Sequence, residues 1–569
     1  MANSKALRHL IQESSAYNRF EDIAKLVETG NLAMVPVHPL YVSLLSASSD
    51  QVAKIIPDLS HEQRQAMIDL DLWQKDRIDV DSFEYWIEVY SKVEDLKFTQ
   101  EFVKNENFLI YLKSRVNIYT FDTEDPEYPD HDHYFLTDDM LLLIEYSEEY
   151  KYATELKYLI RNLYDKLGVD KAYSLLFKLI NDSYSLLEEQ EYQNSKSRLR
   201  DYGFVDYFEA KEKTFAFASL KGIDRYISSH IALTPEIDLN SKLQNLHSSA
   251  LTSFNKEIDL IEEELALVKD DKRQDFLNFS FLRLVNSVIV VNNAMKEGSI
   301  ELSRIGNNTK KFVNLGIDKV RSVQNDLSDF VIFERFDFFD LYRIGHSLIE
   351  LNKKKLVKSL SPYAENKEKL LMFLGGHFEN FLDNSNLDIP KFQHPNGSVV
   401  EVSNYNDVQE WQSWVNLFTE IIPYISSFFK SLESLLKQNI HNNTYINYEL
   451  NQIDFEAVII TTLIRDEQSI KEERLGLNFS ELQDFITKYF NRTNSGHFLK
   501  DFSDNKIRQM LESFSNRFEL RDRELFLKYL YLILKEQLSD YDYDSLSPED
   551  YQHIGGPLLL NGDTFQKDN

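Results

Sequence analysis

The sequence predicts an all-α protein, a multi-helix array of αα-hairpins in a solenoid-like arrangement, with one small β-hairpin near residues 392–402. Its 569 residues contain 16 glycines and 12 prolines, the two residue types that helix interiors tolerate least. Apolar residues recur three or four positions apart through most of the chain, which is the spacing of one helical face. Hydrophobic residues make up 43% of the chain, so these helices can bury a sizeable core.

The first 120 residues are predicted to form an N-terminal array of helical hairpins. Short helices with tight joins are expected over 40–47, 50–56, 61–73 and 82–90. Four pairs have the spacing of a capping box, in which a side chain accepts from an N–H of the first turn: Ser48 with Gln51, Ser60 with Gln63, Asp81 with Glu84 and Ser480 with Gln483. Helices joined by so few residues pack as antiparallel neighbours.

Residues 121–136 interrupt the helical pattern. This stretch is acidic and contains Pro126 and Pro129, so we expect a loop or linker. Thr137 precedes two aspartates that would complement a helix dipole, which predicts that the next helix starts there.

A central helical domain is predicted over 137–383. Within it, apolar residues at steps of three or four from Leu243 to Val268 predict one long, straight helix. The most apolar stretch, 276–291, is shorter than the roughly 20 residues of a membrane span and is interrupted by Arg283. We therefore expect a buried central helix and no membrane insertion.

The C-terminal part is predicted as a loop or β-hairpin over 384–405, a helical domain over 406–540 and an acidic tail over 541–569. Asn396-Gly397 stands before the alternating residues Ser-Val-Val-Glu-Val, which is a strong hairpin signal. We expect this hairpin to be the only β element of the chain.

Composition excludes several classes of function. Without cysteine the chain has no thiol nucleophile, disulfide, iron–sulfur cluster or cysteine-ligated zinc. The net charge of −30 repels phosphates and anionic lipid headgroups, so we expect no nucleic-acid partner. No pair of glycines has the spacing of a nucleotide-binding loop, and we expect no cofactor. The first 16 residues lack the apolar region of a signal peptide, which predicts a cytoplasmic protein.

One local cluster could bind a metal. Asp130, His131, Asp132 and His133 place two imidazoles two residues apart between carboxylates, and these groups could hold a divalent cation if the loop folded back. The alternative is an exposed acidic loop that happens to contain two histidines. Oligomeric state is not predictable from the residues.

Aromatic residues are abundant, with 39 Phe and 31 Tyr. They can fill the core between helices, or they can line a groove for a helix or peptide of a protein partner, because aromatic side chains dominate the energetics of interfaces. Both interpretations stay open.

Several segments together resemble a family of bacterial proteins known only as a domain of unknown function. The segments are DLDLW at 69–73, DRID at 76–79, Trp86, GFVDYFEA at 203–210, NLGI at 314–317 and LYRIGH at 341–346. The resemblance covers about residues 30–360 or the whole chain. It implies a bacterial protein, and no catalytic residue can be transferred from it.

These segments have structural interpretations. Gly203 and Gly316 are expected to end or turn helices. Arg343 and His346 lie three residues apart, on one face of a predicted helix. A buried arginine needs a partner, and Asp340 or Asp337 is near enough in sequence to provide it. The group is either a structural network or part of a ligand pocket.

The combined prediction is a cytoplasmic helical scaffold or protein-interaction protein without catalytic activity. The alternative is an enzyme or ligand sensor with a polar site near Arg343, His346 and Asp340, or with a metal site near His131 and His133. Fold alone cannot decide between them.

Overall fold

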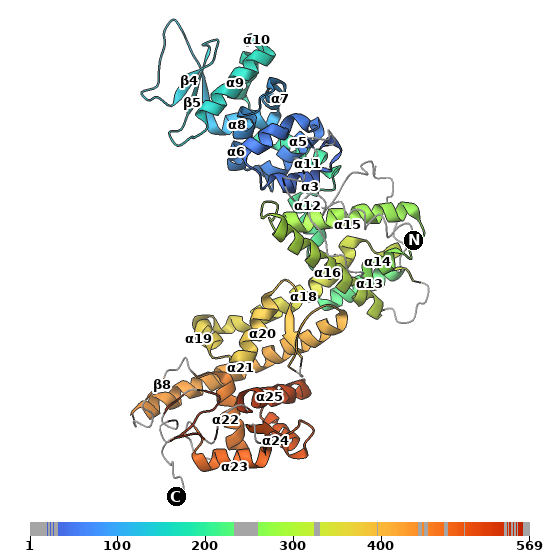
Figure 1. Ribbon diagram of the computed structural model, residues 1–569, viewed down its shortest axis with the longest axis vertical. Helices are drawn as coiled ribbons and strands as arrows, with labels where there is room; N and C mark the ends of the chain where they lie inside the picture. Colours follow the sequence, from blue (N-terminus) through green and yellow to red (C-terminus); the bar gives the residue numbers. More distant parts are fainter. Residues whose placement is uncertain are drawn as a thin grey trace. The chain divides into compact units, whose positions relative to one another are not determined.

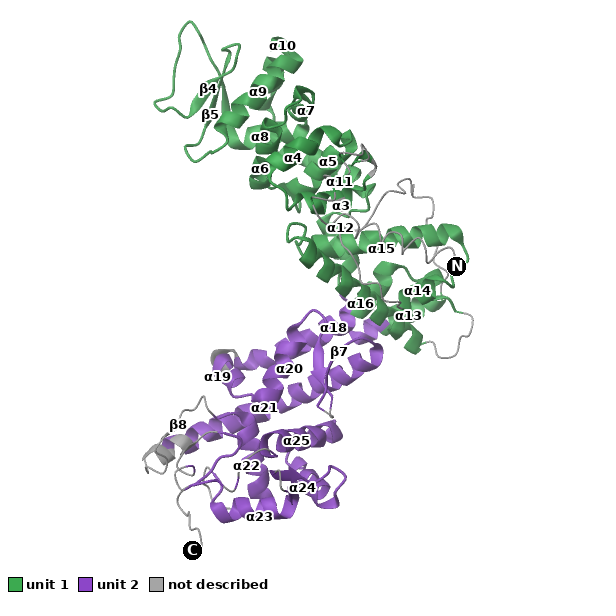
Figure 2. Ribbon diagram, viewed as in Figure 1, with its two compact units in different colours: residues 1–215, 224–345 green, residues 216–223, 346–569 purple. Residues whose placement is uncertain are grey.

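The computed structural model describes residues 32–232, 260–323, 330–394, 397–441, 453–470, 476–493, 496–539 and 556–561, with isolated residues elsewhere. These residues are mostly helical, with a few short strands (Figure 1). The chain divides into two compact units: unit 1 comprises residues 1–215 and 224–345, and unit 2 comprises residues 216–223 and 346–569 (Figure 2).

Unit 1 is built mostly from helices. Its helices are η1 (Leu32–Met34), α3 (Val37–Leu44), α4 (Ser49–Ile55), η2 (Ile56–Asp58), α5 (His61–Leu72), α6 (Val80–Ser91), α7 (Leu96–Phe102), α8 (Glu106–Arg115), α9 (Ala153–Leu167), α10 (Val169–Asn181), α11 (Tyr184–Arg200), α12 (Tyr207–Thr214), α14 (Leu260–Leu265), α15 (Asp271–Val291), α16 (Ser299–Val323) and α17 (Ile332–Arg335). Helices α13 (Leu220–Ala232) and α18 (Phe338–Leu360) contribute residues to both units.

The capping boxes at Ser48 and Ser60 are confirmed. Each side chain accepts a hydrogen bond from the backbone N–H three residues later, and the glutamine there reaches back. Helices α6 and α23 (Phe479–Tyr489) begin two residues before the predicted starts, because Asp79 and Asn478 cap them instead. Short polar residues crowd both places, and any of them could accept the first N–H.

Unit 1 contains a β-sheet that the sequence analysis missed, so the expectation of one β element was wrong. Strands β3 (Val116–Thr120), β5 (Leu142–Tyr146) and β4 (Tyr134–Leu136) form an antiparallel sheet in that order. A further hairpin joins β1 (Trp73–Gln74) to β2 (Arg77–Ile78). Thr137 does not start a helix: its hydroxyl donates to Asp139, and Met140 closes the β4–β5 turn at a φ of 57°. Residues that cap helices also build turns.

Among the long helices of unit 1, α16 and α18 cross at close range. The predicted buried helix at 276–291 is confirmed as α15. Gly316 was expected to end or turn a helix, but it lies inside α16, where an added Cβ would meet the Leu341 carbonyl oxygen at 2.0 Å. Gly203 does follow the end of α11, at a φ of 82°. The predicted helix from 243 to 268 lies outside the described residues as far as 259; α14 begins at Leu260.

Unit 2 is also mostly helical. Its elements after α18 are η3 (Ser361–Asn366), α19 (Lys367–Met372), α20 (Gly376–Asn386), β6 (Lys391–Gln393), β7 (Val399–Glu401), α21 (Tyr405–His441), β8 (Asn447–Tyr448), α22 (Phe455–Glu467), α23, β9 (Phe490–Thr493), β10 (Gly496–Leu499), α24 (Asn505–Ser515), α25 (Arg523–Leu538) and β11 (His553–Ile554). The predicted hairpin near 392–402 is confirmed, because β6 and β7 pair antiparallel with Phe392 opposite Val400. The predicted tail is described only in part; within it Leu558, Leu559 and Leu560 are buried, and the Leu559 N–H donates to the Thr461 hydroxyl of α22.

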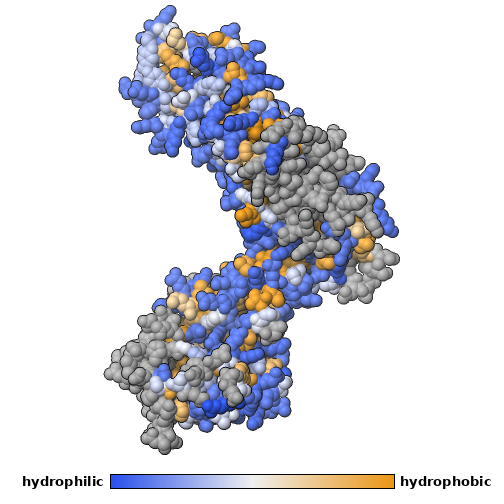
Figure 3. All heavy atoms as spheres, in the orientation of Figure 1, coloured by the Kyte–Doolittle hydropathy of each residue, from blue (hydrophilic) through white to orange (hydrophobic). Residues whose placement is uncertain are grey.

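Among the residues that the structure describes, no helix combines the length and apolar character that crossing a bilayer requires. Hydrophilic side chains cover most of the visible described surface, and hydrophobic ones form scattered patches (Figure 3).

Candidate functional site

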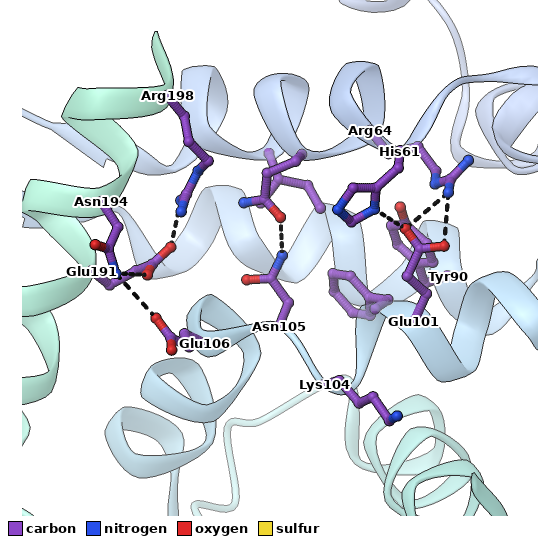
Figure 4. Close-up of a pocket in the computed structure, with 13 residues that line it drawn as sticks. His61, Arg64, Tyr90, Glu101, Lys104, Asn105, Glu106, Glu191, Asn194 and Arg198 are labelled. Atoms are coloured by element: carbon purple, nitrogen blue, oxygen red, sulfur yellow. Dashed lines mark hydrogen bonds and ion pairs between the residues drawn. The ribbon is translucent and has the colours of Figure 1, made fainter. Parts of the chain in front are cut away.

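A cavity of about 450 Å³ in unit 1 is lined by side chains of α5, α6, α7, α8 and α11 and of the segment that joins α7 to α8. We call it the α5–α11 cavity. Figure 4 shows two groups of polar and charged side chains with Asn105 between them. One group consists of His61, Arg64 and Glu101, and the other of Glu106, Glu191, Asn194 and Arg198. The side chains of Ile68, Tyr90 and Phe102 add apolar surface to the lining.

Arg64 and Glu101 form a closed ion pair in the first group. Both Glu101 carboxylate oxygens accept from Arg64 Nη2, at 2.8 and 2.7 Å, and His61 Nδ1 lies 2.5 Å from Oε1. Arg64 is buried, donates to the Leu59 carbonyl and lies over the Phe98 ring at 4.7 Å. Burial alone would raise the pKa of Glu101, but the bonds from Arg64 and His61 outweigh it and lower that pKa. In this group the charge of the Glu101 carboxylate is therefore balanced by the Arg64 guanidinium.

The second group is built on a buried carboxylate. Asp69 is 1% exposed, and Arg198 donates to both of its oxygens, from Nε at 2.7 Å and Nη2 at 2.9 Å. The same Nη2 donates to Glu191 Oε1 at 2.5 Å. Burial raises the pKa of Asp69, against the opposing effect of Arg198 and neighbouring amides. One guanidinium therefore serves two buried carboxyl groups.

Glu106 adds a third carboxyl group at this end. Asn194 Nδ2 lies 3.4 Å from Glu106 Oε2 and 3.2 Å from Glu191 Oε2, so a single amide joins the two carboxyls. Glu191 is 2% exposed, whereas Glu106 is exposed. Burial, and then the Glu106 carboxyl, raise the pKa of Glu191 to about 7, although Arg198 opposes them. Glu191 is therefore the carboxyl group of this end that retains a proton close to neutral pH.

The two groups are linked through amides. Gln65 donates to Asp69 Oδ1 at 3.0 Å and accepts from Asn105 at 2.6 Å. Asn107 is fully buried and donates to Glu191 at 3.2 Å, and its Oδ1 has no hydrogen-bond partner among the described residues. Charged groups thus dominate a cavity whose two ends differ in charge: the Glu101 end is balanced, and the Glu191 end has excess carboxyl groups.

The predicted group around Arg343 lies elsewhere in unit 1. Asp337 and Asp340 cap the start of α18 reciprocally, each side chain accepting from the other's backbone N–H at 2.9 Å. The Tyr226 hydroxyl donates to Asp340, and Arg343 lies 5.7 Å from the centre of the Tyr226 ring while donating to the Phe215 carbonyl at 3.2 Å. Tyr226 therefore brings Arg343 and Asp340 together.

Burial raises the pKa of Asp337 in this group to about 7. His346 follows on α18 among the residues of unit 2, is half-buried, and its burial lowers its pKa to about 4.

The predicted metal cluster lies on the segment between β3 and β4. The rings of His131 and His133 are 5.5 Å apart, and His131 Nε2 lies 3.0 Å from Glu145 of β5. Asp130 and Asp132 are exposed. Within the described part of the chain, no group of three or more histidine, cysteine, aspartate or glutamate side chains has an arrangement able to hold a metal ion.

Sequence reasoning did not identify the α5–α11 cavity. Its charged residues come from positions 61, 101 and 191, far apart in the chain, and none forms a local motif. One signal was present: Asp69 shares a helical stripe with Ala66 and Leu72, so a charge stands on an apolar face. That pattern predicts a buried partner, which is Arg198.

Residues 5–554 match a family described as "Family of unknown function (DUF6178)". No curated protein matches the chain, and no solved structure matches it.

Proposed function

Because the chain belongs to the DUF6178 family, whose function is unknown, its role has to be argued from its own residues, and we propose that unit 1 is a ligand sensor. The α5–α11 cavity would bind a small polar molecule without transforming it. The observation that carries this proposal is the cavity's charged lining, held in place by paired neighbours.

Three features of the lining favour binding. A volume of about 450 Å³ lies within the range of small-molecule sites. The guanidinium groups of Arg64 and Arg198 are each fixed by a carboxylate, so the cavity is preorganised and a ligand does not have to order it. Apolar side chains of Ile68, Tyr90 and Phe102 lie beside the charged groups, so the lining offers both polar and apolar contacts.

The test is a screen by ligand-observed NMR with a mixture of amino acids, amines, carboxylates and nucleotides. Asn194→Trp places an indole at the lining of the cavity, whereas Gln193→Trp adds the same group to its exposed neighbour outside the lining. We expect a compound that binds the wild type and Gln193→Trp and does not bind Asn194→Trp. No binding compound, or equal binding to both variants, would refute the sensor proposal.

A second function, docking of a protein partner on a solenoid-like helical scaffold, is favoured by one observation. Val169, Tyr173, Phe177 and Ile180 share a face of α10, and Val169, Phe177 and Ile180 are 52%, 40% and 36% exposed. Tyr173 and Phe177 stack at 5.7 Å. An exposed apolar stripe at helical spacing suits an amphipathic helix of a partner.

Docking is tested by affinity purification after cross-linking. Phe177→Glu should lose a stoichiometric partner that Phe208→Glu retains, because Phe208 is an exposed aromatic residue on α12. The net charge of −30 disfavours nucleic acid as that partner and, with the absence of cysteine, suits a cytoplasmic protein. Equal recovery with both variants would contradict docking on α10.

A further inference from the structure

The last described segment of the chain, residues 558–561, lies in unit 2 against Thr461 of α22 and the pair Gly476 and Leu477, which we call the tail site. We propose that the tail site is a docking site for an extended, leucine-containing segment of another protein, and that residues 558–561 occupy it as a displaceable internal ligand. The proposal concerns unit 2 and depends on neither function proposed for unit 1.

The tail site holds the segment by its main chain. The Leu477 N–H donates to the Leu559 carbonyl at 2.9 Å, and the Asn561 N–H donates to the Leu477 carbonyl at 2.8 Å. These two bonds form a parallel β-bridge. The Leu559 N–H donates to the Thr461 hydroxyl at 3.0 Å. Proteins that add an extended peptide to a strand edge use the same pairing of main-chain groups.

The leucine side chains of the segment are enclosed. Leu558, Leu559 and Leu560 are 1%, 2% and 4% exposed. Because successive side chains of an extended chain point to opposite faces, Leu559 and Leu560 need apolar surroundings on two faces. The tail site therefore selects leucines and disfavours a charged residue in their place.

Gly476 allows the main chain of the segment to approach. This glycine is buried, and an added Cβ would lie 2.5 Å from the carbonyl carbon and oxygen of Leu560 and 2.7 Å from the Leu559 carbonyl oxygen. These obstacles are backbone atoms, which no side-chain rotation can move. The tail site is therefore shaped to a peptide main chain, which any protein segment can supply.

The attachment of the segment allows it to leave. Gly556 precedes it, is exposed and has a φ of 79°, and an added Cβ there would meet nothing within 4 Å. A glycine in open space changes its backbone angles at little cost, so the residues after it can turn away while the rest of unit 2 stays in place. Residues 555–562 carry no charged side chain, so no side-chain ion pair ties them to the tail site.

A partner has to compete with this internal ligand. A segment joined by a short flexible linker is present at an effective concentration of about 1 mM. A partner segment therefore binds when its own contacts are tighter, or when something else has released residues 558–561. The chemistry of the partner is that of the internal ligand: an extended, uncharged segment with successive leucines.

The experiment is fluorescence anisotropy of a labelled peptide, Gly-Gly-Pro-Leu-Leu-Leu-Asn-Gly, with the full chain. Wild-type protein at about 100 μM should bind less than about a tenth of the peptide, because the internal segment competes at about 1 mM. Leu559→Asp places a charge in the internal segment, and should bind the peptide at least about tenfold more tightly than the wild type. A peptide N-methylated at the leucine equivalent to Leu559 lacks the N–H that Thr461 accepts, and should bind this variant about tenfold more weakly.

Further variants, made in the Leu559→Asp background, locate the binding. Gly476→Ala should abolish it, because the new Cβ obstructs the peptide main chain, whereas Gly376→Ala adds a Cβ that meets nothing within 4 Å and should have no effect. Thr461→Val should weaken binding about tenfold by removing an acceptor. Thr462→Val is its matched control, because both hydroxyls donate at 2.7 Å to a carbonyl four residues back in α22 and the bond to the segment is made by Thr461.

Hydrogen exchange of the wild type tests displacement without any substitution. If the segment opens while unit 2 stays folded, the amides of Leu559 and Asn561 should exchange at least about a hundredfold faster than the amides in the middle of α22. If the segment is a permanent part of the core, these amides exchange together with those of α22, and the proposal is wrong.

The binding outcomes are equally decisive. The proposal fails if folded Leu559→Asp does not bind the peptide, if the N-methylated peptide binds as tightly as its parent, or if Gly476→Ala binds as Gly376→Ala does. If Leu559→Asp does not fold, the hydrogen exchange of the wild type decides. A wild-type dimer that Gly476→Ala abolishes would place the segment of a second copy in the tail site, and would overturn the assignment to another protein.

Discussion

The crossing of α16 and α18 in unit 1 makes a strong steric prediction. A Cβ built on Gly345 would lie 1.9 Å from the Phe312 carbonyl oxygen, and one built on Gly316 would lie 2.0 Å from the Leu341 carbonyl oxygen. Ordinary contacts begin at 3.4 Å, so either alanine forces the helices about 1.5 Å apart. Both obstacles are backbone atoms, which cannot rotate away as a side chain can.

The magnitude follows from two opposing effects. Overpacking of a core costs about 1–3 kcal/mol, and a backbone obstacle places these sites at the upper end. Alanine recovers about 1 kcal/mol through its higher helix propensity. We therefore expect Gly316→Ala and Gly345→Ala each to lower the free energy of unfolding by about 2 kcal/mol. At about 2–4 °C per kcal/mol, the unfolding midpoint should fall by about 4–8 °C.

The assay is thermal unfolding followed by circular dichroism at 222 nm. Gly222→Ala is the control, since its Cβ would meet only Ser219 Oγ, at an ordinary 3.4 Å, and it should be neutral or slightly stabilising. The double variant should lose less than the sum of the two single variants, because the first alanine already separates the helices. Single variants within about 1 °C of the wild type, or strict additivity, would refute a shared crossing.

Three further predictions concern stability. Arg64→Lys should cost about 1–3 kcal/mol in chemical unfolding, because a single ammonium nitrogen cannot bind Glu101 and the Leu59 carbonyl from two separate nitrogens while lying over the Phe98 ring; an unchanged midpoint would contradict this. Burial raises the pKa of Glu456 from 4.5 to about 7, so the folded protein keeps a proton that the unfolded chain releases. The free energy of unfolding should therefore fall by about 3 kcal/mol as the pH rises from 4.5 to 7. Glu456→Gln should abolish that fall, and a variant whose thermal unfolding has the same pH dependence as the wild type would exclude Glu456 as its cause. Met140→Gly should stabilise by about 0.5–1 kcal/mol by relieving a left-handed residue, whereas Met372→Gly in α19 should destabilise.

Local signals in the sequence were sufficient where one turn of chain contains the whole interaction. Ser48 with Gln51 and Ser60 with Gln63 complete their capping boxes within four residues, and both are present. The 392–402 hairpin closes over a similarly short span. The β3–β5–β4 sheet is different, because β3 pairs with a strand more than 20 residues further on, and neither strand has a turn signal that identifies the other.

The predictions that failed concern contacts between residues far apart in the sequence. Glycine often ends a helix, so the residue type of Gly316 predicted a helix end. Only the close approach of α18 explains why a glycine is needed inside α16. The cavity depends on the same kind of contact: Arg198 meets Asp69 across 129 positions of sequence. The charge of Asp69 on the apolar face of α5 indicates that a buried partner exists, but hydrophobic periodicity cannot show where in the chain that partner lies.

The two polar groups of unit 1 differ in what their carboxyls have left to bind. Asp337 and Asp340 use their oxygens on each other's backbone N–H groups and on the Tyr226 hydroxyl, so this group fixes the start of α18. Glu191 shares the Asn194 amide with Glu106 of the first turn of α8, and Arg198 divides its guanidinium between Glu191 and Asp69. Of Glu191 and Glu106, only Glu191 is buried, and a buried charge costs stability unless something else neutralises it. The cavity, rather than the Arg343 group, is therefore the place to look for a ligand, because its polar side chains line a hollow of about 450 Å³ and are not used to cap a helix start as Asp337 and Asp340 are.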